Sequence, residues 1–70
     1  MIPGNKVKRA IEVVAGDNIL YHRKWVRVRS VEHDWVDQYY RVIIRFHDGT
    51  VLSLPADNTV DVRVEPQGIA

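Results

Sequence analysis

The chain has 70 residues, a hydrophobic fraction of 46% and a formal net charge of +1 at pH 7. This length makes one small domain whose core is only just sufficient for stability, and the near-neutral charge excludes a strong overall field that attracts nucleic acid. Cysteine is absent, which excludes disulfides and thiolate metal sites and favours an intracellular, cytoplasmic location.

The first part of the chain is expected to be an arm followed by an interrupted strand. Residues 1–5 contain a proline and a glycine and predict a flexible arm, with no apolar run of a signal peptide. Residues 6–14 alternate enough at Ile11 and Val13 to suit a strand, although Lys8-Arg9 could instead open a short helical turn. A turn over 15–18 follows, and the strand resumes at 19–21. No segment approaches membrane-spanning length, so no membrane partner is expected.

The next predicted strand runs from Trp25 to Glu32. Its valines at 26 and 28 point to one face, while Trp25 and the arginines at 27 and 29 point to the other. At Ser30-Val31 the alternation slips by one residue, which indicates a bulge of the kind that bends a barrel corner. Residues 33–37 are expected to form a loop, in which Trp35 and Val36 are apolar enough to fold over an open end of the core.

Residues 39–54 carry the clearest signal, a β-hairpin with a turn at Asp48-Gly49. A two-residue loop would pair Phe46 with Val51. A three-residue loop with Gly49 in the left-handed region would pair Phe46 with Thr50 instead. Only the second register puts the large apolar side chains on one face. We therefore predict that register, with an inner face of Val42, Ile44, Phe46, Leu52 and Leu54.

The end of the chain predicts one further strand. Pro55 should stop the hairpin ladder, and residues 56–58 should turn the chain, with room for a single 3₁₀ turn. Residues 59–65 alternate valine with charged residues, and residues 66–70 form a tail. Five short strands in so short a chain predict an all-β fold, a small SH3-like partly open barrel over residues 6–65. An OB-like barrel is the alternative, but it needs longer strands and a helix.

Two stretches of the chain resemble known small barrels. Residues 13–19, VVAGDNI, are similar to the opening of KOW-type SH3-like barrels, although His22-Arg23-Lys24-Trp25 stand where that motif has glycines. Residues 46–64 resemble small barrel-like proteins of actinobacteria and their phages. The resemblance implies an SH3-like fold, a bacterial or phage setting and a cytoplasmic location in the bacterial host cell.

The outward face of the central strands is the candidate binding surface. Antiparallel pairing of residues 25–32 with residues 39–46 would gather basic and aromatic side chains, which together can contact phosphates and stack on bases. We call this set the basic face: Trp25, Arg27, Arg29, Tyr39, Arg41, Ile43 and Arg45. DNA or RNA is the first partner expected there. Because Trp25, Ile43 and Val51 are apolar, a protein partner or a homodimer is the alternative.

Other features of the sequence carry little chemistry. His22, His33 and His47 fall in predicted turns without the spacing of a zinc motif, so no metal or other cofactor is expected. The basic group Lys6, Lys8 and Arg9 is too small to indicate a nucleic-acid arm by itself. No serine lies in a nucleophile elbow, and the acidic residues are scattered. The sequence therefore predicts a binding module that is not an enzyme and has no small-molecule substrate.

Overall fold

One long strand, β3 (Lys24–Val36), organises the fold because it belongs to both halves of the sheet. The computed structural model describes residues 5–63. The beginning of β3 pairs with β2 (Asn18–Tyr21), and the remainder pairs with β4 (Tyr39–Phe46). The register shifts between Val28 and Ser30. This shift confirms the predicted phase slip and sets it at Arg29, the residue before the predicted position. The extra residue reverses which side chains of β3 face the core.

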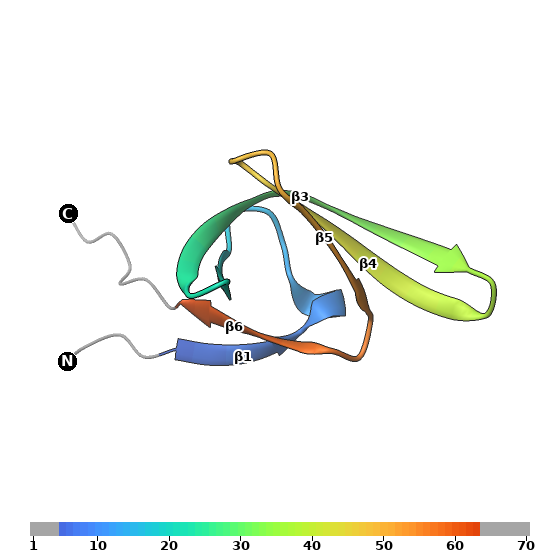
Figure 1. The fold of residues 1–70 in the computed structure, drawn as a ribbon. Helices are drawn as coiled ribbons and strands as arrows, with labels where there is room; N and C mark the ends of the chain where they lie inside the picture. The colour runs from blue at the N-terminus through green and yellow to red at the C-terminus, as the bar shows by residue number, and fades with distance from the viewer. Residues whose placement is uncertain (1–4, 64–70) are drawn as a thin grey trace.

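The remaining strands complete an antiparallel sheet that curls around one core (Figure 1). They are β1 (Asn5–Arg9), β5 (Val51–Pro55) and β6 (Thr59–Arg63). The order across the sheet is β1-β6-β2-β3-β4-β5. The prediction of an all-β, partly open small domain is confirmed.

The sheet has six strands rather than the five expected, because the predicted first strand is split into β1 and β2. A 3₁₀ turn, η1 (Ala10–Glu12), follows β1. Ala10 is fully buried, and its N–H donates to the carbonyl oxygen of Asn58 at 2.6 Å. The N–H of Arg9 donates to the carboxylate of Glu12 at 3.0 Å. These bonds end β1 and turn the chain toward β2.

The β4–β5 hairpin has the predicted three-residue loop. Ile44 is opposite Leu52, and the N–H of Phe46 donates to the carbonyl oxygen of Thr50 at 2.9 Å. Gly49 has a φ of +92°, the left-handed conformation that glycine adopts at little cost. The inner face therefore packs as predicted: Phe46, Ile44 and Val42 are buried, and the two leucines of β5 pack against them.

The core lies inside the curl of the sheet and takes its buried side chains from four strands and the segment around η1. Its fully or almost fully buried side chains come from η1, β2, β3, β4 and β6 and from the segment after η1: Ala10, Val13, Ile19, Val26, Val28, Val42, Ile44, Phe46 and Val62. Tyr21 closes one side by stacking on Phe46, with ring centroids 5.7 Å apart. Among the described residues no polar or charged residue is buried.

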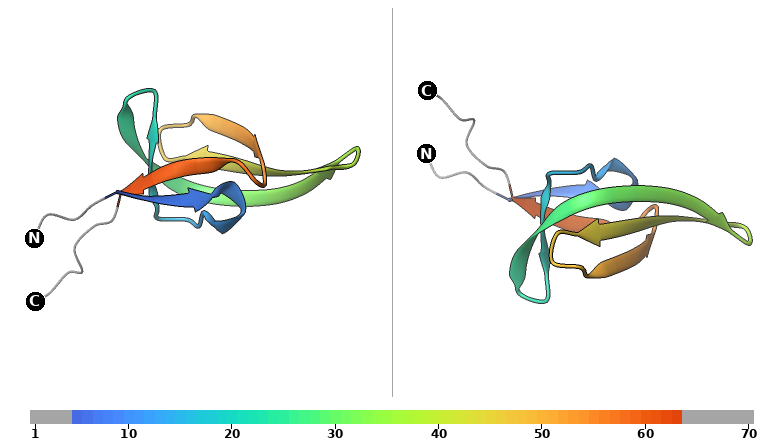
Figure 2. Two further views of the ribbon diagram at one scale, coloured as in Figure 1. Left: turned by 90° about the horizontal axis from the view of Figure 1, so that it is seen from below. Right: turned by 90° about the horizontal axis from the view of Figure 1, so that it is seen from above.

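The β3–β4 hairpin corrects one sequence prediction. Residues 33–37 were expected to form a loop, but β3 continues to Val36, and only Asp37 and Gln38 connect it to β4. Asp37 has a φ of +57°, which makes a tight connection possible without glycine. The hairpin consequently extends beyond the rest of the sheet (Figure 2). His33 therefore lies in a strand and not in a turn.

The predicted domain limits are only partly within the described region. Asn5, expected in the arm, is the first residue of β1. The rest of the arm, the end of the predicted last strand and the tail at 66–70 lie outside the described residues. Within residues 5–63 there is no helix that is long and apolar enough to cross a membrane.

Candidate functional site

The basic face is divided between two parts of the sheet. Trp25 is opposite Leu20 of β2 and Arg27 is opposite Asn18, whereas the register pairs of β3 with β4 begin only at Val28. Tyr39 and Arg41 lie near the far end of the β3–β4 hairpin, where their partners on β3 are Val36 and Asp34. The structure therefore brings together only parts of the predicted set, with the Trp25 and Arg27 side chains at one end and those of Tyr39 and Arg41 at the other.

Acidic residues lie on the same surface as the arginines of β4. Glu32 is opposite Ile43, and its carboxylate accepts from Arg45 at 2.8 Å. The guanidinium of Arg41 donates to the hydroxyl and the carbonyl oxygen of Ser53, at 3.0 and 3.2 Å. Glu32 and Asp34 reach this face because the bulge at Arg29 reverses the alternation of β3. The outer surface of β4 is thus balanced in charge rather than uniformly basic.

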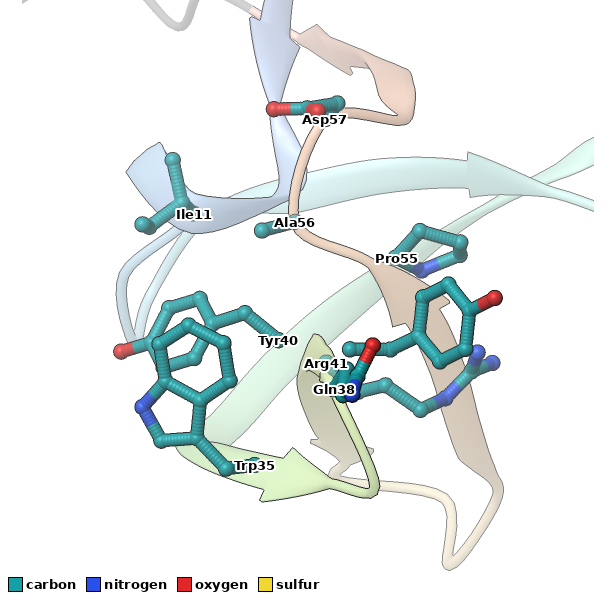
Figure 3. A pocket seen from close by; sticks show the side chains of 9 residues that line it. Ile11, Trp35, Gln38, Tyr40, Arg41, Pro55, Ala56 and Asp57 are labelled. Atoms are coloured by element: carbon teal, nitrogen blue, oxygen red, sulfur yellow. The ribbon is translucent and has the colours of Figure 1, made fainter.

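A second surface, which the sequence did not predict as a site, lies at the far end of the same hairpin. It is a hollow of about 450 Å³ between the hairpin, η1 and the turn after β5 (Figure 3). We call the four large side chains that close the hairpin the aromatic end: Trp35, Val36, Tyr39 and Tyr40. Three of them line the hollow, together with Ile11, Gln38, Arg41, Pro55, Ala56 and Asp57.

The rings of Trp35 and Tyr40 form one wall of this hollow. Their centroids are 4.8 Å apart with an interplanar angle of 48°, and His33 meets Tyr40 edge-on at 5.7 Å. Trp35 is nevertheless 68% exposed and Tyr39 is 71% exposed. The prediction that Trp35 and Val36 fold over the core is therefore wrong, because both side chains project from the hairpin into solvent.

Main-chain hydrogen bonds hold the opposite wall in place. The N–H of Ala56 donates to the carbonyl oxygen of Tyr40 at 3.0 Å. The N–H of Ile11 in turn donates to the carbonyl oxygen of Ala56 at 3.3 Å. This chain of bonds joins β4, the turn after β5 and η1. Ile11 and Ala56 thus face the Trp35 and Tyr40 rings across the hollow (Figure 3), which is supported by sheet-like bonding rather than by a loose loop.

The chemistry of the hollow suits binding. Its lining contains aromatic, aliphatic and proline side chains, one carboxylate from Asp57 and one guanidinium from Arg41, which is held by Ser53. It contains no serine, cysteine, histidine or lysine that would act as a nucleophile or base. Among residues 5–63, no three histidine or acidic side chains group as metal ligands.

One sequence signal could have indicated this surface. Trp35-Val36 and Tyr39-Tyr40 flank Asp37-Gln38 symmetrically, as the two ends of strands joined by a two-residue turn would. Without a glycine in the turn, that pattern resembles an ordinary loop.

Comparison with known proteins adds no relative from which a function could be carried over. No family model matches the chain, and neither a curated protein nor a solved structure is similar enough to count as a match.

Proposed function

We propose that this protein is a small non-enzymatic interaction module that binds another protein through its aromatic end. The observation that supports the proposal is the exposure of Trp35, which is 68% accessible although it lies against Tyr40 and a hollow. Clustered exposed aromatic rings next to a concavity are typical of interfaces, in which Trp and Tyr are preferred anchors.

The area available at Trp35 is large enough to anchor an interface. A tryptophan has roughly 250 Å² of surface, so an exposed fraction of 68% leaves about 170 Å² to be covered. At about 25 cal/mol per Å², covering it contributes about 4 kcal/mol before the costs of association are subtracted. Tyr39, which is 71% exposed, adds a second ring at the same end of the hairpin. A pair of such residues at the centre of a contact would make a hot spot.

Nucleic-acid binding through the basic face is the second candidate. It is supported by the exposed arginines at 27 and 29, which lie close along β3 to the half-buried ring of Trp25. It is weakened by Glu32, which neutralises Arg45 on the same surface. Real phosphate contact would show a steep loss of affinity as salt rises.

The setting is part of the same proposal. The absence of cysteine supports a cytoplasmic location, and the resemblance to actinobacterial and phage proteins supports a bacterial host cell.

A homodimer through Ile43 and Val51 is the form of protein interaction that needs no other partner. Val51 is half exposed and Ile43 is half-buried on that surface.

The experiment uses the immobilised chain and two matched double variants in a nuclease-treated bacterial lysate. The first variant is Trp35→Ala with Tyr39→Ala, and the second is Arg27→Ala with Arg29→Ala. The proposal expects a specific protein to be retained by the wild type and the arginine variant and lost from the aromatic variant. Loss from the arginine variant alone would contradict it. A light-scattering mass of the free chain separates a monomer from a homodimer.

A further inference from the structure

The second half of β3 has a neighbour on one side only. β2 pairs with β3 over Lys24–Arg27, and the remaining register pairs of β3, which reach Val36, are with β4. Among the described residues no strand pairs with the other edge over residues 30–36. In both views of Figure 2 this part of β3 runs along the rim of the hairpin, with β4 beside it. An unpaired strand edge is a template for adding another strand.

The register identifies which main-chain groups face this edge. The N–H of Phe46 and the carbonyl of Tyr40 bond toward β5, whereas the N–H of His47 donates to the carbonyl oxygen of Arg27 on β3 at 3.1 Å. In an antiparallel pair, both main-chain groups of a residue point to the same neighbour, and the direction alternates. The β3 residues that bond to β4 are therefore those at 30, 32, 34 and 36. Val31, His33 and Trp35 present their N–H and C=O groups to the open edge.

The side chains along this edge differ between the two faces of the sheet. On the inner face, Val31 packs against the core and Trp35 lines the hollow. On the outer face are Glu32 and Asp34. Glu32 is engaged by Arg45. Asp34 has no ion pair within the described part of the chain, because Arg41, which is opposite it, donates to Ser53 instead.

We propose that this edge of β3 accepts an extended segment of another protein as an additional strand. The segment has lysine or arginine on the outer face, next to Asp34, and apolar side chains on the inner face, next to Val31 and Trp35. This inference rests on the proposed function and deepens it, since it states how the partner reaches the aromatic end. Main-chain bonds to Val31, His33 and Trp35 supply affinity, and the alternating side chains supply selectivity.

The charges argue against a second copy of this chain as the occupant. Antiparallel pairing of two β3 edges about His33 would set Glu32 of each copy opposite Asp34 of the other. Like charges directly opposite one another destabilise a strand pair. The lysine or arginine side chains of a basic segment would instead be attracted to Glu32 and Asp34. The outer face therefore favours a basic segment of a different protein.

The test uses a short synthetic peptide that alternates lysine with valine, and a counterpart that alternates glutamate with valine. Binding to the full chain is followed by fluorescence anisotropy. His33→Pro removes one N–H from the open edge and leaves the bonds to β4, a position at which an edge strand tolerates proline. His33→Val is the matched control, because it loses the imidazole and keeps the N–H. Asp34→Lys reverses the charge of the outer face.

The lysine peptide should bind the wild type and His33→Val similarly and bind His33→Pro about tenfold more weakly. Asp34→Lys should reverse the preference in favour of the glutamate peptide. Equal binding to His33→Pro and His33→Val, or no binding of the lysine peptide to the wild type, would overturn strand addition. The capture experiment separates this failure from failure of the proposed function. If the wild type retains a protein from the lysate and the Trp35→Ala, Tyr39→Ala variant does not, the proposed function stands and only the mode of binding is wrong.

Discussion

Replacing Trp35 by alanine should have a small effect on folding and a large effect on binding. About a third of Trp35 is covered, since 68% is exposed. For a ring of roughly 250 Å², this is about 80 Å², worth at most about 2 kcal/mol and less against a compact unfolded state. Phe46 is only 1% exposed, and its truncation to alanine should cost about 3–5 kcal/mol.

These magnitudes decide which variant remains folded. A chain of 70 residues has a free energy of unfolding of roughly 4–10 kcal/mol. Trp35→Ala should therefore stay folded, whereas Phe46→Ala should lose a much larger part of its stability and, at the lower end of that range, approach its unfolding midpoint in water. Urea unfolding followed by circular dichroism measures both. A cost for Trp35→Ala that equals the cost for Phe46→Ala would show that Trp35 is part of the core, and the proposed function would lose its supporting observation.

Three further predictions concern stability. Gly49→Ala should lower the free energy of unfolding by about 1 kcal/mol, because φ at this position is +92° while an added Cβ meets no atom within 4 Å. An unchanged free energy of unfolding in urea would contradict this backbone conformation. Asp17→Ala should cost more than Lys8→Met, since Asp17 accepts from both the Lys8 ammonium at 2.9 Å and the Val14 N–H at 3.1 Å; the reverse order in urea midpoints would contradict it. The hydroxyl and N–H of Thr50 hold the pKa of Asp48 below its ordinary value of 3.8, so this carboxylate stabilises the fold above that pH and its contribution is lost as the pH falls through the lowered pKa. The difference in urea midpoint between wild type and Asp48→Ala should accordingly shrink at acidic pH, and a constant difference would contradict it.

The parts of the fold that the sequence predicted well are those determined by local patterns. The β4–β5 hairpin follows from two apolar runs and a glycine that permits one loop. The length of the β3–β4 hairpin was missed, because residues 33–37 are mostly polar and Asp37 takes its positive φ without glycine. Tertiary pairing with β4, through Trp35 opposite Tyr40, decides that region.

The candidate site was harder to predict than the core. The alternation predicts a bulge at Ser30-Val31, but the predicted basic face takes its β3 residues only from before that bulge. One extra residue moves the side chains of all later residues of the strand to the opposite face of the sheet. Glu32 and Asp34 consequently share a surface with Arg41 and Arg45. The core side of β4 was unaffected, because its alternation is continuous from Tyr39 to Phe46.

The most direct test of protein binding at the aromatic end is a nuclear magnetic resonance titration. The ¹⁵N-labelled chain is titrated with the protein retained from the lysate, and in parallel with a short single-stranded oligonucleotide. We expect the protein to shift the amide signals of His33, Trp35, Tyr39 and Tyr40 and the indole signal of Trp35. Shifts centred instead on Arg27 and Arg29, produced by the oligonucleotide and weakened by salt, would contradict the proposal and favour nucleic-acid binding.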